Sequence, residues 1–192
     1  MKSTPVLPGN YKEIYALDLN SDKKLALLVN GLALIISVVM AVVMLFIVPV
    51  STLFRSHDDQ LHYWFRLGVL VAGMFVYIVL HEAVHGIAMK LCGCKNVRFG
   101  VKGTYAFAST DYYIAKKPYV VIALAPVVVW GVVLTVINCL VPVDWFWVVY
   151  IIQIINISGA AGDLYVTGKF LRLPPDILIR DYGVGMTVYS AQ

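Results

Sequence analysis

The sequence predicts an all-α membrane protein with four transmembrane helices and a small cytoplasmic β-hairpin between the second and the third helix. The composition is the first observation behind this prediction, because 60% of the 192 residues are apolar, only 14% are charged, and the mean hydropathy is +0.82. Soluble domains are about 45–50% apolar and about 25% charged. The composition therefore disfavours a soluble enzyme, a disordered chain and a nucleic-acid-binding protein.

Four apolar runs are the second observation. A helix needs about 20 apolar residues to cross the hydrocarbon layer of a bilayer, and the runs that reach this length are Leu25 to Val50, Leu67 to Met89, Tyr119 to Val141 and Trp145 to Gly168. The first run begins too late, and is too long, for a cleaved signal peptide. We expect each run to form a transmembrane helix, with a kink at Pro126 in the third.

The distribution of Lys and Arg is the third observation, and it predicts the orientation. With four crossings, Arg55 and Arg66 lie on one side of the membrane, and the other thirteen of the 15 basic residues lie on the side of the termini. Basic residues are concentrated in cytoplasmic loops, so both termini are expected in the cytoplasm. The expected organisation is a cytoplasmic segment over residues 1–24, a membrane core over 25–173 and a cytoplasmic tail over 174–192.

Two segments outside the four runs have the pattern of strands. Residues 96–111 alternate apolar and polar side chains on both sides of Gly103, which predicts a β-hairpin. The tail after Pro175 is also strand-like, and Asp181 in it is typical of a turn residue. An exposed edge strand can pair with an extended peptide, which gives the hairpin a role in presenting a substrate, although an ordinary hairpin that shields the helices explains the pattern equally well.

The second apolar run contains the motif His81-Glu82-Ala83-Val84-His85. Residues four apart share one face of a helix, so both imidazoles can bind a single Zn²⁺, and Glu82 lies beside them where it can take a proton from water at the metal. Each ionisable residue at membrane depth costs about 2.5–3.5 kcal/mol, and zinc would compensate this cost. The alternative is a hydrogen-bonded proton relay without metal.

Asp163 is the candidate for a third ligand, because a catalytic zinc takes three protein ligands. The histidine pair and Asp163 precede Lys90 and Lys169 by similar distances, so they are expected at the same depth in the membrane. The alternatives for Asp163 are an ion pair with Lys169 or a role at a helix end. The remaining histidines, His57 and His62, lie in the outer loop and are poor candidates.

Asn156 lies seven residues before Asp163, which is about two turns of helix on the same face. Its amide is suited to positioning a substrate or stabilising an oxyanion, and it is equally suited to hydrogen bonding between helices. The run of small residues over 158–162 permits close approach of another helix, for which Ala83 and Gly86 are the expected partners.

These residues resemble a known group. His81–Gly86, Ala125-Pro126 and Gly162-Asp163 match the pattern of small bacterial four-span membrane proteins described as putative zincin peptidases (DUF3267). The chain is more distantly similar to intramembrane zinc metalloproteases of the site-2 protease type, but it lacks the prolines and the glycine around their Asn and Asp. The resemblance covers about Leu67 to Leu173 and implies zinc, proteolysis and a bacterial cytoplasmic membrane.

The sequence therefore predicts a membrane-embedded zinc metallopeptidase that acts on membrane-associated proteins or peptides. In this prediction His81, His85 and Asp163 bind Zn²⁺, Glu82 activates water, and Asn156 positions the substrate. The expected partners are such a substrate and the lipid bilayer, with no nucleic acid. The alternative is a non-catalytic membrane zinc-binding sensor or scaffold subunit, which a fourth protein ligand such as Cys92 or Asp181 would favour.

Overall fold

The computed structural model describes the chain except for residues 1, 19–20, 55–59, 104, 184 and 192. Arg55 and His57 therefore lie outside the described residues. The chain forms two compact units, each assembled from separate stretches of sequence. The sheet unit consists of Met1–Val29, Glu82–Pro126 and Gly162–Gln192, and the helical unit consists of Asn30–His81 and Val127–Ala161.

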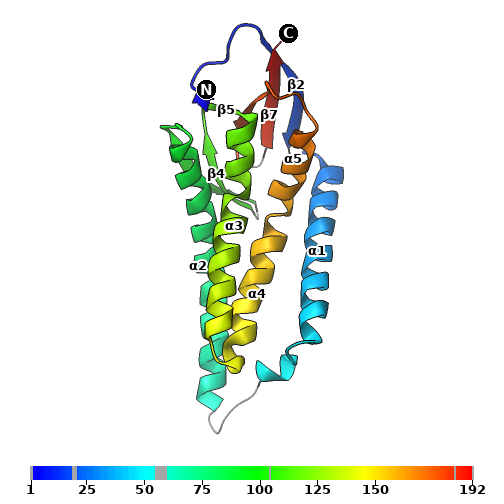
Figure 1. Cartoon of the computed structure of the whole chain (residues 1–192), viewed down its shortest axis with the longest axis vertical. Helices are drawn as coiled ribbons and strands as arrows, with labels where there is room; N and C mark the ends of the chain where they lie inside the picture. The colour runs from blue at the N-terminus through cyan, green and yellow to red at the C-terminus, as the bar shows by residue number, and fades with distance from the viewer. Residues whose placement is uncertain (1, 19–20, 55–59, 104, 184, 192) are drawn as a thin grey trace. The chain divides into compact units, whose positions relative to one another are not determined.

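The helices follow the four apolar runs (Figure 1). Their bounds are α1 Lys23–Leu45, α2 Gln60–Leu91, α3 Lys116–Leu140, α4 Val143–Gly159 and α5 Ala161–Leu171, with a short 3-10 helix at Val50–Thr52. With α4 and α5 taken together, four helices among the described residues are long and apolar enough to cross a membrane. The fourth run differs from the expectation of one helix, because the helix is interrupted at Ala160.

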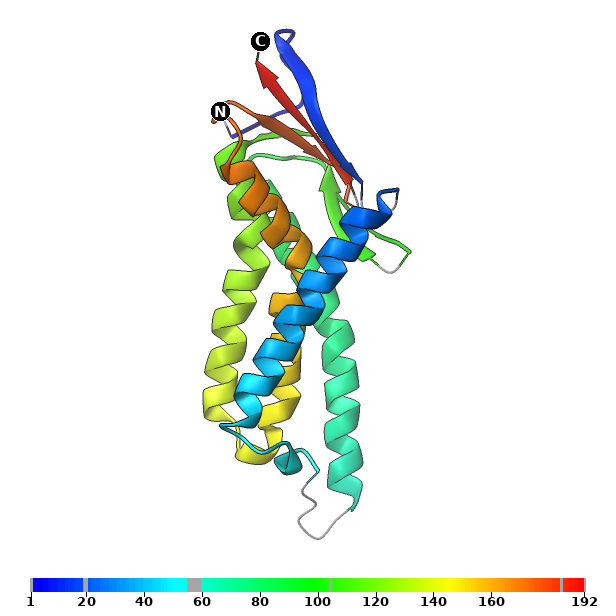
Figure 2. The same cartoon turned by 90° about the vertical axis from the view of Figure 1, so that its right-hand side faces the viewer.

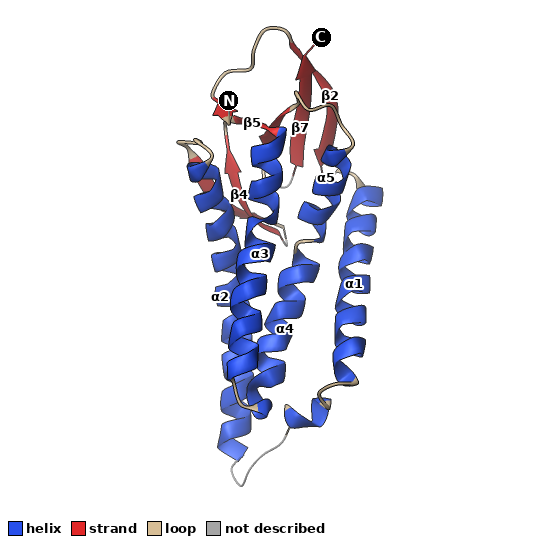
Figure 3. Cartoon of the chain, viewed as in Figure 1, coloured by secondary structure: helices blue, strands red, loops and turns tan. Residues whose placement is uncertain are grey.

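The expectation of an all-α protein is wrong. The chain is 62% helical and 19% strand. A five-stranded antiparallel sheet has the order β1-β5-β6-β7-β2, formed by Ser3–Thr4, Tyr113–Ala115, Leu178–Asp181, Gly185–Ala191 and Tyr11–Asp18. Figure 3 shows the strands in red, and all the described strands belong to the sheet unit.

The five-stranded sheet joins the two ends of the chain. Tyr11 of β2 is paired with Ala191 of β7, and the two strands run side by side in Figures 1 and 2. Strands β2 and β7 each show only moderate alternation of apolar and polar residues, and they lie at opposite ends of the sequence. Local patterns therefore indicate a strand-like tail, but they do not predict the pairing of the tail with the N-terminal segment.

The predicted hairpin is confirmed as a second, two-stranded sheet of β3 (Val97–Lys102) and β4 (Tyr105–Thr110). Gly103, in the turn, has a φ of +64°, a conformation that glycine adopts without strain. The ring of Phe99 lies against Gly86 of α2, where an added Cβ would be only 2.4 Å from the ring. The hairpin thus packs on α2 next to His85.

The helical unit is held by large side chains that also satisfy backbone carbonyls. Its main apolar cluster consists of Leu53, Leu70, Trp147, Val148 and Tyr150. The Trp147 indole donates to the Pro49 carbonyl at 3.2 Å, and the Tyr150 hydroxyl donates to the Met40 carbonyl at 3.1 Å. Arg66, which is 5% exposed, donates to the Asp144 carbonyl at 3.2 Å.

Candidate metal centre

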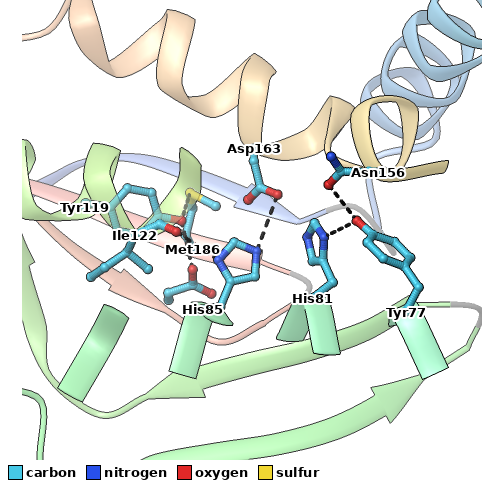
Figure 4. A network of polar contacts seen from close by, with 9 residues as sticks. Tyr77, His81, His85, Tyr119, Ile122, Asn156, Asp163 and Met186 are labelled. Carbon is cyan, nitrogen blue, oxygen red and sulfur yellow. Dashed lines mark hydrogen bonds and ion pairs between the residues drawn. The ribbon is translucent and has the colours of Figure 1, made fainter. Parts of the chain in front are cut away.

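Helix α2 places Tyr77, His81 and His85 on one face at four-residue intervals (Figure 4). Both histidines are almost buried, with 9% of each residue exposed. His81 is the last residue of this stretch of the helical unit and Glu82 is the first of the sheet unit, but α2 is continuous through both. The one-turn separation of the two imidazoles is therefore set by the helix itself.

His85 is held on both of its ring nitrogens. Its Nδ1 lies 2.9 Å from the backbone carbonyl of Ile122 in α3, and its Nε2 lies 3.5 Å from Oδ2 of Asp163 in α5. A carbonyl only accepts hydrogen bonds, so Nδ1 carries a proton and Nε2 is the nitrogen available to a metal.

His81 is oriented by a chain of side chains in the helical unit. Asn156 is fully buried, and its amide nitrogen lies 3.3 Å from the Val127 carbonyl, so its Oδ1 is free to accept. The Tyr77 hydroxyl donates to this Oδ1 at 2.8 Å and lies 2.6 Å from Nδ1 of His81. The single hydroxyl proton is used on Asn156, so Nδ1 of His81 donates to Tyr77 and Nε2 of His81 is the nitrogen that would bind a metal.

Asp163 owes its position to the break at Ala160. Because α5 begins at Ala161, Asp163 lies in the first turn of a helix, where a carboxylate also interacts favourably with the helix dipole. Asp163 can therefore lie at a helix end, as one of the sequence alternatives expects, and also serve as a metal ligand. Lys169, the other expected partner, lies instead over the ring of Tyr15, with 3.6 Å from Nζ to the ring centroid.

His81, His85 and Asp163 each offer one ligand atom, and these atoms lie within 4.8 Å of one another. Two imidazole nitrogens and one carboxylate oxygen are a donor set that suits catalytic zinc, which keeps a further position open. Among the described residues His62, Cys92 and Asp181 do not belong to this group. The residues present therefore fit a three-ligand zinc site.

The Glu82 carboxylate interacts with the backbone of Ala108 in β4. This contact ties the carboxylate to the strand that packs beside α2. Glu82 follows His81 by one residue, so it points about 100° away from the ligand face and is suited to a proton-transfer role next to a metal.

A second buried carboxyl group, that of Asp181 at the end of β6, lies in the sheet unit. Its Oδ2 accepts from the Tyr119 hydroxyl at 2.8 Å and its Oδ1 from the Gly183 amide at 2.7 Å. Burial raises the pKa of Asp181 to about 6, although both hydrogen bonds act to lower it. Asp181 is a turn-flanking residue, as its pattern indicates, but its pairing with Tyr119 has no signal in the sequence.

The structure brings together the ligand candidates His81, His85 and Asp163. It adds Tyr77 and the Ile122 carbonyl, which the sequence analysis missed. A signal for both exists in the sequence, since Tyr77 precedes His81 by four residues on α2 and Ile122 precedes Pro126 by four residues on α3.

Comparisons with known proteins show a family to which the chain is similar. A family model described as "Putative zincin peptidase" (DUF3267) matches residues 74–178, which include all three ligand candidates and Glu82. An uncharacterized 24.7 kDa protein in the gap 5' region of Pyrococcus woesei is 28% identical over 148 residues, which are 71% of this chain and 59% of that protein. The chain thus spans less than two thirds of the length of this curated relative. No solved structure matches the chain.

The raised pKa of Asp181 predicts a pH dependence of stability. The folded pKa of about 6 lies above the ordinary value of 3.8, so the folded state binds the proton more tightly than the unfolded state. Asp181 therefore adds roughly 3 kcal/mol to the free energy of unfolding below about pH 4, and this contribution is lost as the pH rises to about 6. Denaturant unfolding of the metal-free protein in detergent should show this loss for the wild type and not for Asp181→Asn. An equal loss in both proteins would contradict the assignment.

Proposed function

Since the chain belongs to the putative zincin peptidase family, we propose that it is a membrane-embedded zinc metallopeptidase that hydrolyses peptide bonds of membrane-associated proteins or peptides. The observation that carries this proposal is the group of His81, His85 and Asp163, which presents a zinc donor set next to Glu82.

The surfaces of the apolar helices support membrane embedding. Leu27, Leu61, Phe75 and Leu140 are each at least 69% exposed, and many other large apolar side chains of the helices are exposed as well. Soluble proteins rarely expose apolar surface on this scale. We propose that lipid covers these side chains and that both termini are cytoplasmic, as the distribution of basic residues predicts.

His81, His85 and Asp163 would hold the zinc ion, with both histidines binding through Nε2. When bound, zinc would supply Lewis-acid activation of water and of the scissile carbonyl group. The protein's own contribution is to fix the donors before the metal arrives. Because Tyr77 and the Ile122 carbonyl hold the two Nδ1 atoms, neither ring needs to reorient on binding.

Glu82 moves the proton in the proposed reaction. Its carboxylate takes a proton from the attacking water while the water oxygen forms a bond to the carbonyl carbon of the substrate. The bond between this carbon and the amide nitrogen then breaks, and Glu82 passes the proton to the leaving nitrogen. The products are a carboxyl group and an amine, and Glu82 returns to its starting state.

We propose that the free edge of β4 binds the substrate as an extended strand. Lys102 and Tyr105 are the pair next to the turn, and Val101 and Ala106 are the following pair. Pairs in an antiparallel hairpin alternate, so the backbone N–H and C=O groups of Val101 and Ala106 point away from the partner strand. Ala108 lies two residues further along the same edge as Ala106, and its backbone interacts with the Glu82 carboxylate. A peptide added at this edge would lie beside the general base.

We propose that Asn156 contributes by orienting His81 through Tyr77. Its complete burial and its contact with Tyr77 favour the hydrogen-bonding role between helices, which the sequence left open beside a direct contact with substrate.

The second candidate is a membrane zinc sensor or scaffold without activity. A purely structural zinc site is closed by four protein ligands, whereas three ligand candidates are grouped within the described part of the chain. Glu82 beside them also has no purpose in a structural site. Both observations favour the peptidase.

Replacing the general base tests the mechanism. Glu82→Gln is nearly isosteric and removes the proton acceptor, so cleavage of a membrane-associated peptide should fall by about 10²–10⁴-fold while zinc stays bound. His85→Ala should instead lose the zinc, which metal analysis of the purified protein detects. The matched control is Glu13→Gln at the other glutamate of the chain, which lies exposed on β2 and should leave cleavage unchanged. Wild-type activity in Glu82→Gln would refute the mechanism.

Proline substitution tests the edge strand. Ala106→Pro removes an outward amide of β4 and should lower kcat/KM for an extended peptide about tenfold, with zinc content unchanged. Val101→Pro removes the corresponding outward amide of β3, directly opposite in the register, and serves as the control with unaltered cleavage. If both variants or neither of them lost activity, the β4 edge would not be the substrate site.

A further inference from the structure

Helix α3 contains a proline in its interior, at Pro126. In an α-helix each backbone amide donates to the carbonyl four residues earlier. Proline has no amide hydrogen, so Pro126 leaves the carbonyl of Ile122 without its usual helical donor.

That carbonyl is the one that His85 contacts. Nδ1 of His85 lies 2.9 Å from the oxygen of Ile122, as Figure 4 shows. The carbonyl of α3 that lacks a helical donor because of Pro126 is therefore the same carbonyl that contacts the ring of His85.

The released carbonyl is poorly placed to find another donor. Ile122 is 2% exposed, and the side chain of Pro126 is fully buried. A buried carbonyl without a donor costs about 1–3 kcal/mol, and lipid offers no compensation. The Nδ1 proton of His85 meets this need, so the ring is held by a backbone group that cannot rotate away.

We propose that Pro126 is a positioning residue of the metal centre. By omitting one helical hydrogen bond, it reserves the Ile122 carbonyl for Nδ1 of His85 and thereby directs Nε2 of His85 toward the metal. The inference rests on the proposed function in taking zinc as the metal and lipid as the surroundings of the helices. It gives the interior proline a chemical role that differs from the bending of the helix.

Pro126→Ala tests this role, because it restores an amide that competes for the Ile122 carbonyl. The affinity for Zn²⁺, measured by competition with a chelator, should fall about 10- to 100-fold, as is typical when the partner of a ligating histidine is disturbed. In ¹⁵N-histidine NMR spectra of the zinc-loaded protein, the exchange-protected Nδ1 proton of His85, assigned by its absence in His85→Gln, should lose its protection.

Two controls separate the missing amide from the shape of the proline ring. Pro118→Ala changes a proline in the first turn of the same helix, where an added amide takes no helical carbonyl, so zinc affinity should stay within about twofold. Incorporating the α-hydroxy analogue of alanine at position 126 removes the ring but still supplies no amide hydrogen. This ester variant should keep the zinc affinity and the Nδ1 protection of the natural protein.

The proposal is overturned if Pro126→Ala keeps both the affinity and the protected Nδ1 proton, or if the ester variant loses zinc as severely as Pro126→Ala. These outcomes are distinct from a failure of the proposed function. A wild-type protein that binds zinc with a protected Nδ1 proton but cleaves no peptide would refute the peptidase and leave the role of Pro126 intact.

Discussion

The hydrogen bonds on the Nδ1 atoms of His81 and His85 are the interactions on which the rest of the site depends. An imidazole that binds a metal through one nitrogen must have the other nitrogen satisfied, and within apolar helices the protein alone can supply the partner. His85 uses the backbone of Ile122, whereas His81 uses the hydroxyl of Tyr77. In both arrangements Nδ1 is held by the protein, so Nε2 is the nitrogen that would bind a metal.

The sheet unit supplies what the helices cannot. Strand β4 brings its backbone to Glu82, and β6 brings the carboxyl group of Asp181 to Tyr119 at the start of α3. A helix interior cannot offer a backbone amide in the way that β4 does, because a helix uses its own amides internally. The glycines at the contacts allow close packing, since Gly86 accepts the ring of Phe99 and Gly183, with a φ of +94°, accepts Phe107.

The sequence predicts the parts of the structure that are encoded locally. The four apolar runs, the hairpin around Gly103 and the spacing of His81 and His85 each depend on residues close to one another in the chain. The expectation that Asp163 lies near the histidines used helix geometry and the positions of Lys90 and Lys169, and the three ligand atoms do lie within 4.8 Å of one another. The pairing of β2 with β7 depends on two segments at opposite ends of the chain, and the partner of Asp181 lies 62 residues away. Such contacts are set by the tertiary structure and leave no periodic signal, which is why the sheet was missed.

The break between α4 and α5 is predicted only in part from the sequence. Residues 158–162 are small, which indicates close packing, but their pattern does not predict the interruption of the helix at Ala160. Its consequence is that Asp163 begins a helix. The same short stretch thus places the carboxylate near His85 and sets its direction.

The metal content of the protein and the identity of the metal's ligands test the central claim most directly. X-ray absorption at the zinc edge, with elemental analysis of protein purified without chelators, should show one zinc ion per chain with two imidazole nitrogens and oxygen in its first coordination sphere. The oxygen contribution should diminish in Asp163→Ala. A protein that binds no zinc, or a zinc ion surrounded by four protein ligands, would contradict the account.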